Sequence, residues 1–148
     1  MNIISPMKQA LEQAKLSAKH GEVPVGAVIV HNGKVIVKER NKMRELNDQT
    51  AHAEILAIRK ALLILNESRL KKCDLYVTLE PCTMCAGAIS LAKIRRVYYG
   101  AEDKKGGAVD NGVRFFSAKT CHHKPEVIGG IEEQAAGLLL TKFFALRR

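Results

Sequence analysis

One histidine, one glutamate and two cysteines in the middle of the chain constrain its fold more than any other feature. His52 and Glu54 lie two residues apart, and Cys82 and Cys85 follow Pro81 with the spacing P-C-x-x-C. Zinc binds imidazole nitrogen and thiolate sulfur in tetrahedral geometry, and three protein ligands leave the fourth position to water, as in catalytic sites. The chain must therefore fold so that His52, Cys82 and Cys85 can meet at one ion.

The local spacing predicts how these groups are carried. Cys82 and Cys85 are three residues apart, so one helical turn places both sulfurs on one face. Pro81 suits the first turn of that helix, where a missing N–H costs nothing. The free N–H groups at a helix start favour thiolate over thiol. The segment between His52 and Cys82 has room for a helix and a strand that return the chain to the same place.

Glu54 supplies a carboxylate beside the metal motif without being needed as a ligand. Such a group can take a proton from zinc-bound water and pass it to a substrate nitrogen, which is general acid–base catalysis combined with a nucleophile generated at neutral pH. The chemistry that fits is hydrolytic attack on an amidine-like carbon with loss of ammonia.

Other interpretations of the motif remain open from the sequence. A C-x-x-C pair also occurs as a redox pair or as half of a structural zinc site, and His-x-Glu can simply begin a helix. Cys73 or Cys121 could supply a fourth ligand and close the metal site. Neither alternative requires Pro81 or Glu54, so we favour the open, catalytic site.

Composition bounds the class of protein. The chain has 148 residues with 47% hydrophobic content, which predicts a single domain over residues 1–148 with a real core. The net charge of +9 points to an anionic partner, most simply nucleic acid, but charge alone fits a generally basic, soluble protein equally well. Four cysteines, two of them in the metal motif, indicate a reducing compartment. No signal peptide or apolar run of roughly 20 residues is visible, so we expect a cytoplasmic protein without a membrane segment.

Hydrophobic periodicity and turn signals predict alternating helices and strands. Ser5-Pro6 predicts an N-cap and first helical residue, Gly21 the end of that helix, and Thr50 the cap of the helix carrying His52. Asn32-Gly33 predicts a hairpin turn. The expected strands are 25–30, 34–38, 74–79, 96–100 and 126–130, and the expected last helix is 131–146. Strands 74–79 and 96–100 should be parallel with a right-handed crossover, which places a site at their carboxyl ends.

Two regions are less determined. Asn41 follows the hairpin, and its amide could read a purine edge, although turn chemistry is the commoner role of a loop asparagine. Residues 101–124 predict a charged, glycine-rich loop followed by an aromatic anchor. His122-His123 could suggest a second metal, but their spacing argues against it.

The chain resembles the bacterial tRNA-specific adenosine deaminases, within the cytidine-deaminase-like superfamily. The pattern H-x-E…P-C-x-x-C is the signature of zinc-dependent nucleobase deaminases. The resemblance covers nearly the whole chain, and these segments carry it: Gly21–Ala27 (GEVPVGA), Arg40-Asn41, Thr50–Ile55 (TAHAEI), Leu75–Ala88 (LYVTLEPCTMCAGA) and Phe143–Arg148 (FFALRR).

The resemblance implies a three-layer α/β/α fold with a mixed five-stranded sheet, a homodimer, one Zn²⁺ per subunit and no organic cofactor. It implies a hydrolase acting on a cyclic amidine, which converts adenosine to inosine at wobble position 34 of a tRNA anticodon stem-loop, with an arginine tRNA as the expected substrate. Zinc-bound hydroxide would attack C6 of the flipped base, with Glu54 as proton shuttle.

The resemblance also assigns individual residues. His52, Cys82 and Cys85 fall on the zinc ligands, and Glu54 on the catalytic carboxylate. The substrate-binding positions it implies, for the flipped base, the RNA backbone and the anticodon-loop surface, are Asn41, Ala53, Asp103, Phe144 and Arg147. The chain departs from the family pattern over 109–118, so no RNA contact is carried over there.

Two rival functions remain. A deaminase of free guanine, cytidine or deoxycytidylate would use the same metal chemistry without needing a basic surface. A non-catalytic, zinc-stabilised RNA-binding module would require a closed metal shell that includes Cys73 or Cys121.

Overall fold

A mixed five-stranded sheet forms the middle layer of the molecule. The computed structural model describes residues 4–147. The sheet has the order β2-β1-β3-β4-β5, in which β1 is antiparallel to both neighbours while β3, β4 and β5 are parallel. The elements are α1 (Pro6–Lys19), β1 (Gly26–His31), β2 (Lys34–Arg40), α2 (Ala53–Leu65), β3 (Cys73–Leu79), α3 (Thr83–Leu91), β4 (Arg96–Ala101), the 3₁₀ turn η1 (Phe115–Ser117), β5 (Glu126–Ile128) and α4 (Glu133–Ala145).

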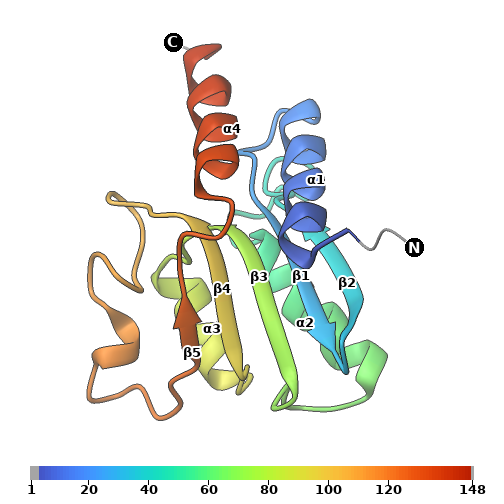
Figure 1. Cartoon of the computed structure of the whole chain (residues 1–148), viewed down its shortest axis with the longest axis vertical. Coiled ribbons are helices and arrows are strands. Elements are labelled where there is room, and N and C mark those ends of the chain that lie inside the picture. The colour runs from blue at the N-terminus through green and yellow to red at the C-terminus, as the bar shows by residue number, and fades with distance from the viewer. Residues whose placement is uncertain (1–3, 148) are drawn as a thin grey trace.

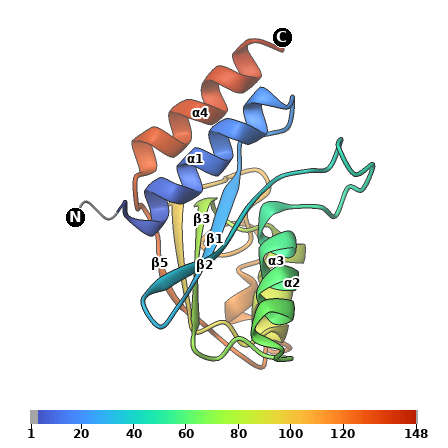
Figure 2. The same ribbon diagram turned by 90° about the vertical axis from the view of Figure 1, so that its right-hand side faces the viewer.

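Helices cover both faces of this sheet. Helices α1 and α4 pack side by side on one face, and α2 and α3 lie on the other (Figure 1). Figure 2 shows the three layers edge-on, with the sheet between the two helix pairs. The predicted α/β/α architecture with a mixed five-stranded sheet is therefore confirmed. In the described part of the chain, no helix combines the length and the apolar character needed to span a bilayer.

Local sequence signals explain several element boundaries. Ser5 Oγ accepts a hydrogen bond of 3.3 Å from the Lys8 N–H, so the predicted cap of α1 is confirmed. Asn32 and Gly33 both have positive φ in the β1–β2 turn, as the hairpin prediction requires. The last strand is shorter than predicted, because it ends at Ile128 before Gly129 and Gly130.

Two predicted helix starts are wrong. Thr50 does not cap α2, because its hydroxyl donates to Asp48 Oδ1 at 2.7 Å, and His52 is the N-cap instead. Pro81 is not in the first turn of α3, because that helix begins at Thr83 with Cys82 as its N-cap. Each metal motif therefore sits at the junction between extended chain and helix.

Close packing of α1 on the sheet positions the segment that leads to the site. Ala10 and Ala14 of α1 are fully buried against β1. A Cβ at Gly26 would lie 1.9 Å from the Ala10 carbonyl oxygen, so only glycine allows this approach. The helix and the chain just before β1 are thereby held as one unit.

Candidate metal centre

The two metal motifs meet at the carboxyl end of β3. This strand ends at Leu79 and leads through Pro81 into α3, while α2 begins beside it at Ala53, directly after its N-cap His52. His52 and Cys82 both have extended backbone as N-caps, with ψ of 150° and 177°. Two helix N-termini therefore point toward the same place, and their partial positive charge favours thiolate there.

The three predicted ligands lie at distances that fit one zinc ion. The Nδ1 atom of His52 is 3.6 Å from the Cys82 sulfur and 3.5 Å from the Cys85 sulfur. Bonds of about 2.3 Å to sulfur and about 2.05 Å to nitrogen, meeting at a tetrahedral angle, place those two atoms about 3.5 Å apart. The donor set and its spacing are therefore suited to tetrahedral zinc.

Among the described residues, no fourth protein ligand completes this group. Over residues 4–147, the metal-ligand cluster here contains only His52, Cys82 and Cys85. Cys73 begins β3, so it lies roughly 20 Å away at the other end of this seven-residue strand. Cys121 contacts Ser90 near the far end of α3, with 3.5 Å between sulfur and hydroxyl oxygen. The closed structural knot is therefore not formed.

The histidine pair does not build a second metal site in the described region. His122 is exposed, and the His123 ring Nε2 donates to the Ile94 carbonyl oxygen at 2.6 Å. Neither residue belongs to a cluster of metal-ligating groups within residues 4–147. The two histidines instead belong to the segment that packs against the end of α3.

Hydrogen bonding within the cluster prepares it to bind a cation. Bonds from the Cys85 thiol and from His52 lower the pKa of Cys82 to about 4, despite its partial burial. The same contact with Cys82, together with burial, raises the pKa of Cys85. The bond to Cys82 also raises the pKa of His52. A divalent cation would replace the protons that these groups share.

Glu54 stands beside the cluster without belonging to it. It lies in the first turn of α2, is 4% exposed, and lines a cavity of about 150 Å³ together with His52 and Cys82. Burial raises the pKa of Glu54 to about 7. A carboxyl group with this pKa can both accept and donate a proton near neutral pH.

Asn41 lines the same cavity and connects the chain before β1 to the start of α2. Its side-chain oxygen accepts from the Ala53 N–H at 2.8 Å, and its amide nitrogen donates to the Val23 carbonyl at 3.1 Å. The side chain is buried, so its role is tertiary rather than turn chemistry. One amide hydrogen and one lone pair of Asn41 remain for a ligand, whereas the Ala53 N–H is already used. Base recognition by Asn41 and Ala53 stays a prediction.

The other three predicted substrate-binding residues line a larger groove that adjoins this cavity. The groove has a volume of about 770 Å³ and lies between α4 and the loop after β4. Asp103 lines both the cavity and the groove, and Phe144 and Arg147 line the groove from α4. Arg147 folds back onto its own helix, with its guanidinium 3.5 Å from the centre of the Phe143 ring. Arg148 lies outside the described residues.

One residue of the site was not identified from the sequence. Glu80 lines the cavity, is 2% exposed, and accepts hydrogen bonds from the loop after β4. The available signal was a carboxylate directly after a buried strand, in a stretch that is otherwise apolar. Its partners could not be read from the sequence, because they lie more than twenty positions further along the chain.

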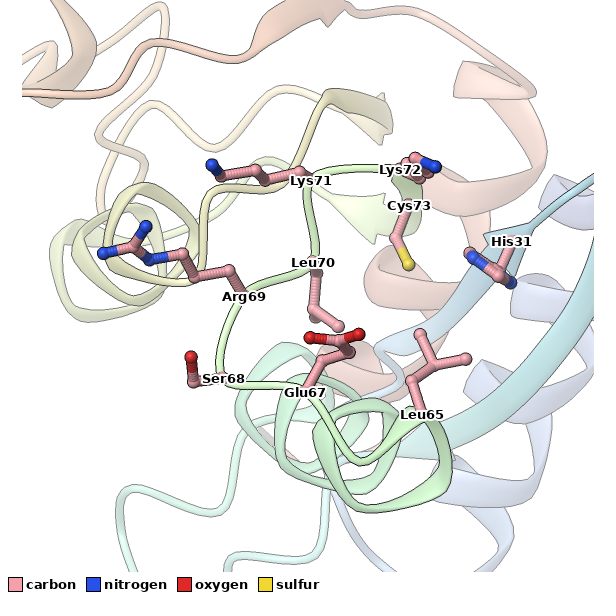
Figure 3. A pocket seen from close by; sticks show the side chains of 9 residues that line it. All are labelled: His31, Leu65, Glu67, Ser68, Arg69, Leu70, Lys71, Lys72 and Cys73. Atoms are coloured by element: carbon pink, nitrogen blue, oxygen red, sulfur yellow. The ribbon is translucent and has the colours of Figure 1, made fainter.

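A separate cavity of about 490 Å³ lies at the opposite end of β3 (Figure 3). It is formed by the chain from Leu65 to Cys73 and by His31 at the end of β1. It contains none of the metal-cluster residues, so it is not part of the candidate site.

The amino-acid sequence is similar to those of known deaminases. Residues 2–101 match the family described as cytidine and deoxycytidylate deaminase zinc-binding region. A tRNA-specific adenosine deaminase of Agrobacterium fabrum is 56% identical over 142 residues, which cover 96% of this chain and 93% of that protein.

Two solved structures place the fold among deaminases. One, from studies of A-to-I editing by tRNA:A34 deaminases at the wobble position of transfer RNA, is 57% identical with a TM-score of 0.90, and the match covers 91% of this chain and 98% of that one. The other, a guanine deaminase of Bacillus subtilis, is 32% identical with a TM-score of 0.65, and covers 99% and 94% of the two chains.

Proposed function

Because the chain belongs to the cytidine and deoxycytidylate deaminase family, we propose that it converts adenosine to inosine at wobble position 34 of tRNA, with an arginine tRNA as substrate. The observation that carries this proposal is the identity of 56% with a tRNA-specific adenosine deaminase over 96% of the chain. The groove beside the cavity supports an RNA substrate, because Lys104 and Lys105 line it with Phe144. Residues 1–148 would act as one domain, in the cytoplasm where this tRNA is used.

The side chains of the site have distinct roles in this reaction. His52, Cys82 and Cys85 would hold one zinc ion per subunit, and no organic cofactor is required. Bound zinc would supply a Lewis acid that activates water for attack on C6 of the base. Glu54 takes a proton from the attacking water and delivers it to N1, then takes the second proton from the new hydroxyl at C6 and delivers it to the leaving amine. Ammonia departs and inosine remains.

The wobble base must leave the anticodon loop to reach Glu54. Bases in a single-stranded loop cost least to unstack, which suits a small buried cavity. Asn41 has one donor and one acceptor free for the edge of the base. Asp103, Phe144 and Arg147 lie where the rest of the anticodon loop would rest. Phosphate contacts by the lysines of the groove predict that affinity falls as salt concentration rises.

The activity can be tested on a transcribed arginine tRNA. We expect inosine at position 34, measured by nucleoside mass analysis, and no inosine in a transcript that carries guanosine at this position. A chelator should abolish the product, and added zinc should restore it. Free guanine, cytidine and deoxycytidylate serve as competing substrates. Turnover of any of these, with none on tRNA, would replace the proposal by a free-base or nucleotide deaminase.

Apolar side chains on the α2–α3 layer support a homodimer. Leu63 and Leu91 are both 81% exposed, and Ile64 and Met84 lie exposed on the same two helices. Large exposed apolar patches mark protein interfaces, and we infer that these four side chains belong to one. A second copy of the chain would remove them from water.

The dimer can be tested by a charge placed in this layer. Leu63→Glu combined with Leu91→Glu is expected to convert a dimer into a monomer in sedimentation velocity, because two carboxylates would have to be buried at the interface. Leu138→Glu provides the matched control, since Leu138 is exposed on α4, across the sheet. A wild-type chain that sediments as a monomer would contradict the dimer proposal.

A further inference from the structure

A buried carboxylate lies between the sheet and the metal ligands. Glu80 follows the last residue of β3 and precedes Pro81 and Cys82. It is 2% exposed, and burying a charged group in this way requires hydrogen bonds or a counter-charge. The Glu80 carboxylate must therefore have such partners.

The hydrogen-bond donors to the Glu80 carboxylate all come from one described segment, residues 102–111, which we call the 102–111 loop. Oε1 accepts from the Asp103 N–H at 3.0 Å and from Asn111 Nδ2 at 2.7 Å. Oε2 accepts from the backbone N–H groups of Val109, Asp110 and Asn111, at 3.1, 2.9 and 3.1 Å. Consecutive N–H groups that converge on one oxygen form an anion-binding nest. The loop is folded around this single carboxylate.

The same loop also contacts the metal motif. The Ala108 N–H donates to the Pro81 carbonyl at 2.9 Å, and Gly107 forms a backbone bridge with Cys82. A Cβ at Gly107 would lie 2.5 Å from the Glu80 carboxyl carbon and 2.5 Å from the Asp103 carbonyl oxygen. Only glycine therefore allows the loop to approach this closely.

The other end of the loop faces the groove. Asp103, Lys104 and Lys105 line the groove beside α4, and Asp103 also lines the small cavity. Asp103 Oδ1 accepts from the N–H groups of Lys105 and Gly106, which shapes the exposed turn. Lys104 and Lys105 therefore lie in a loop whose position relative to Cys82 is held by the hydrogen bonds of Glu80.

We propose that Glu80 is a positioning residue for the RNA substrate, which holds the 102–111 loop in the shape that presents Lys104 and Lys105 to the RNA. This inference rests on the proposed function. Without the carboxylate, the loop N–H groups would turn to water and the loop would sample other conformations. Ordering it again would be a cost of RNA binding. His52 and Glu54 belong to α2, so the chemical step on bound substrate would be largely unaffected.

The test is Glu80→Gln, which keeps the shape of the side chain but replaces one acceptor oxygen by an NH₂ group facing N–H donors. In the zinc-loaded enzyme without RNA, we expect hydrogen exchange in residues 103–111 to become about tenfold faster or more, with no change in α2. For the anticodon stem-loop, KM should rise about tenfold while kcat stays within about threefold. Zinc content should be unchanged.

Two further variants make the test independent of how well Glu80→Gln folds. Asn111→Ala removes the side-chain donor to Glu80 Oε1, together with a longer contact of 3.5 Å to Glu102 Oε1, and should shift exchange and KM in the same direction by about threefold. Glu67→Gln is the control, because Glu67 is an exposed glutamate in the separate cavity at the other end of β3 (Figure 3). It should leave both quantities unchanged. If Glu80→Gln does not fold, Asn111→Ala decides by the same measurements.

The outcomes separate this inference from the proposed function. Unchanged exchange in 103–111 would overturn the anchoring role of Glu80. Faster exchange with an unchanged KM, or a fall in kcat alone, would overturn its role in RNA binding. Exchange is measured without RNA, so it judges the anchor even if the wild-type enzyme forms no inosine, a result that would count against the proposed function itself.

Discussion

Replacing Glu54 with glutamine is expected to lower kcat for inosine formation by about 10²–10⁴-fold, the usual contribution of a positioned general acid–base group. Glutamine keeps the size of the side chain but can neither take a proton from water nor return one to the base. Among the described residues, three carboxyl groups line the cavity beside His52 and Cys82: those of Glu54, Glu80 and Asp103. Glu80 and Asp103 accept hydrogen bonds from the loop after β4, so Glu54 is the one available for proton transfer. Product formation under single-turnover conditions measures the effect.

Zinc content and RNA affinity provide the controls for this variant. Glu54 lies outside the ligand cluster, so Glu54→Gln should bind as much zinc as the wild-type chain. Its dissociation constant for the stem-loop should change little, because the groove is intact. Activity close to that of the wild type would refute the assigned role, and loss of zinc would make Glu54 a ligand instead.

Replacing Cys85 with serine is expected to remove both zinc and activity. Cys85 is fully buried, and its sulfur lies 3.5 Å from His52 Nδ1 in the ligand cluster. A serine hydroxyl is not ionised near neutral pH and is a far poorer zinc ligand than a thiolate. Metal analysis should show less than about one tenth of the wild-type zinc, given the loss of one of three ligands. Inosine should be undetectable.

Another buried cysteine gives the matched comparison. Cys121→Ser changes a buried cysteine that contacts Ser90 and the His123 carbonyl, outside the metal cluster. We expect it to keep zinc and activity. Added zinc should restore a chelated wild-type enzyme but not Cys85→Ser. Full zinc occupancy in Cys85→Ser would exclude Cys85 as a ligand.

The parts of the site that follow from local spacing could be predicted from the sequence. The pattern His-x-Glu and Pro-Cys-x-x-Cys fixes which groups can share an ion, and β-rich runs with an Asn-Gly turn fix most of the sheet. The predicted cap at Thr50 and the predicted first helical residue at Pro81 are each wrong by two residues. A cap depends on where the backbone leaves the extended conformation, and here His52 and Cys82 themselves occupy those positions.

Long-range contacts explain why the other parts of the site could not be predicted from the sequence. Asn41 offered only a choice between turn chemistry and ligand binding, because its partners Val23 and Ala53 are joined to it by the tertiary fold. The 102–111 loop has no periodicity to read, since four of its backbone donors are satisfied by the Glu80 carboxylate rather than by a neighbouring strand or helix turn. A side chain that organises a distant loop leaves no local pattern around itself.

The origin of the three metal ligands has a thermodynamic consequence. His52 comes from the start of α2, and Cys82 and Cys85 come from the start of α3, so their close approach exists only in the folded chain. An ion that binds the native state and not the unfolded one stabilises folding by mass action, by about 2.7 kcal/mol at a free concentration one hundred times its Kd. The resistance of this chain to unfolding would then depend on how much zinc the surroundings supply.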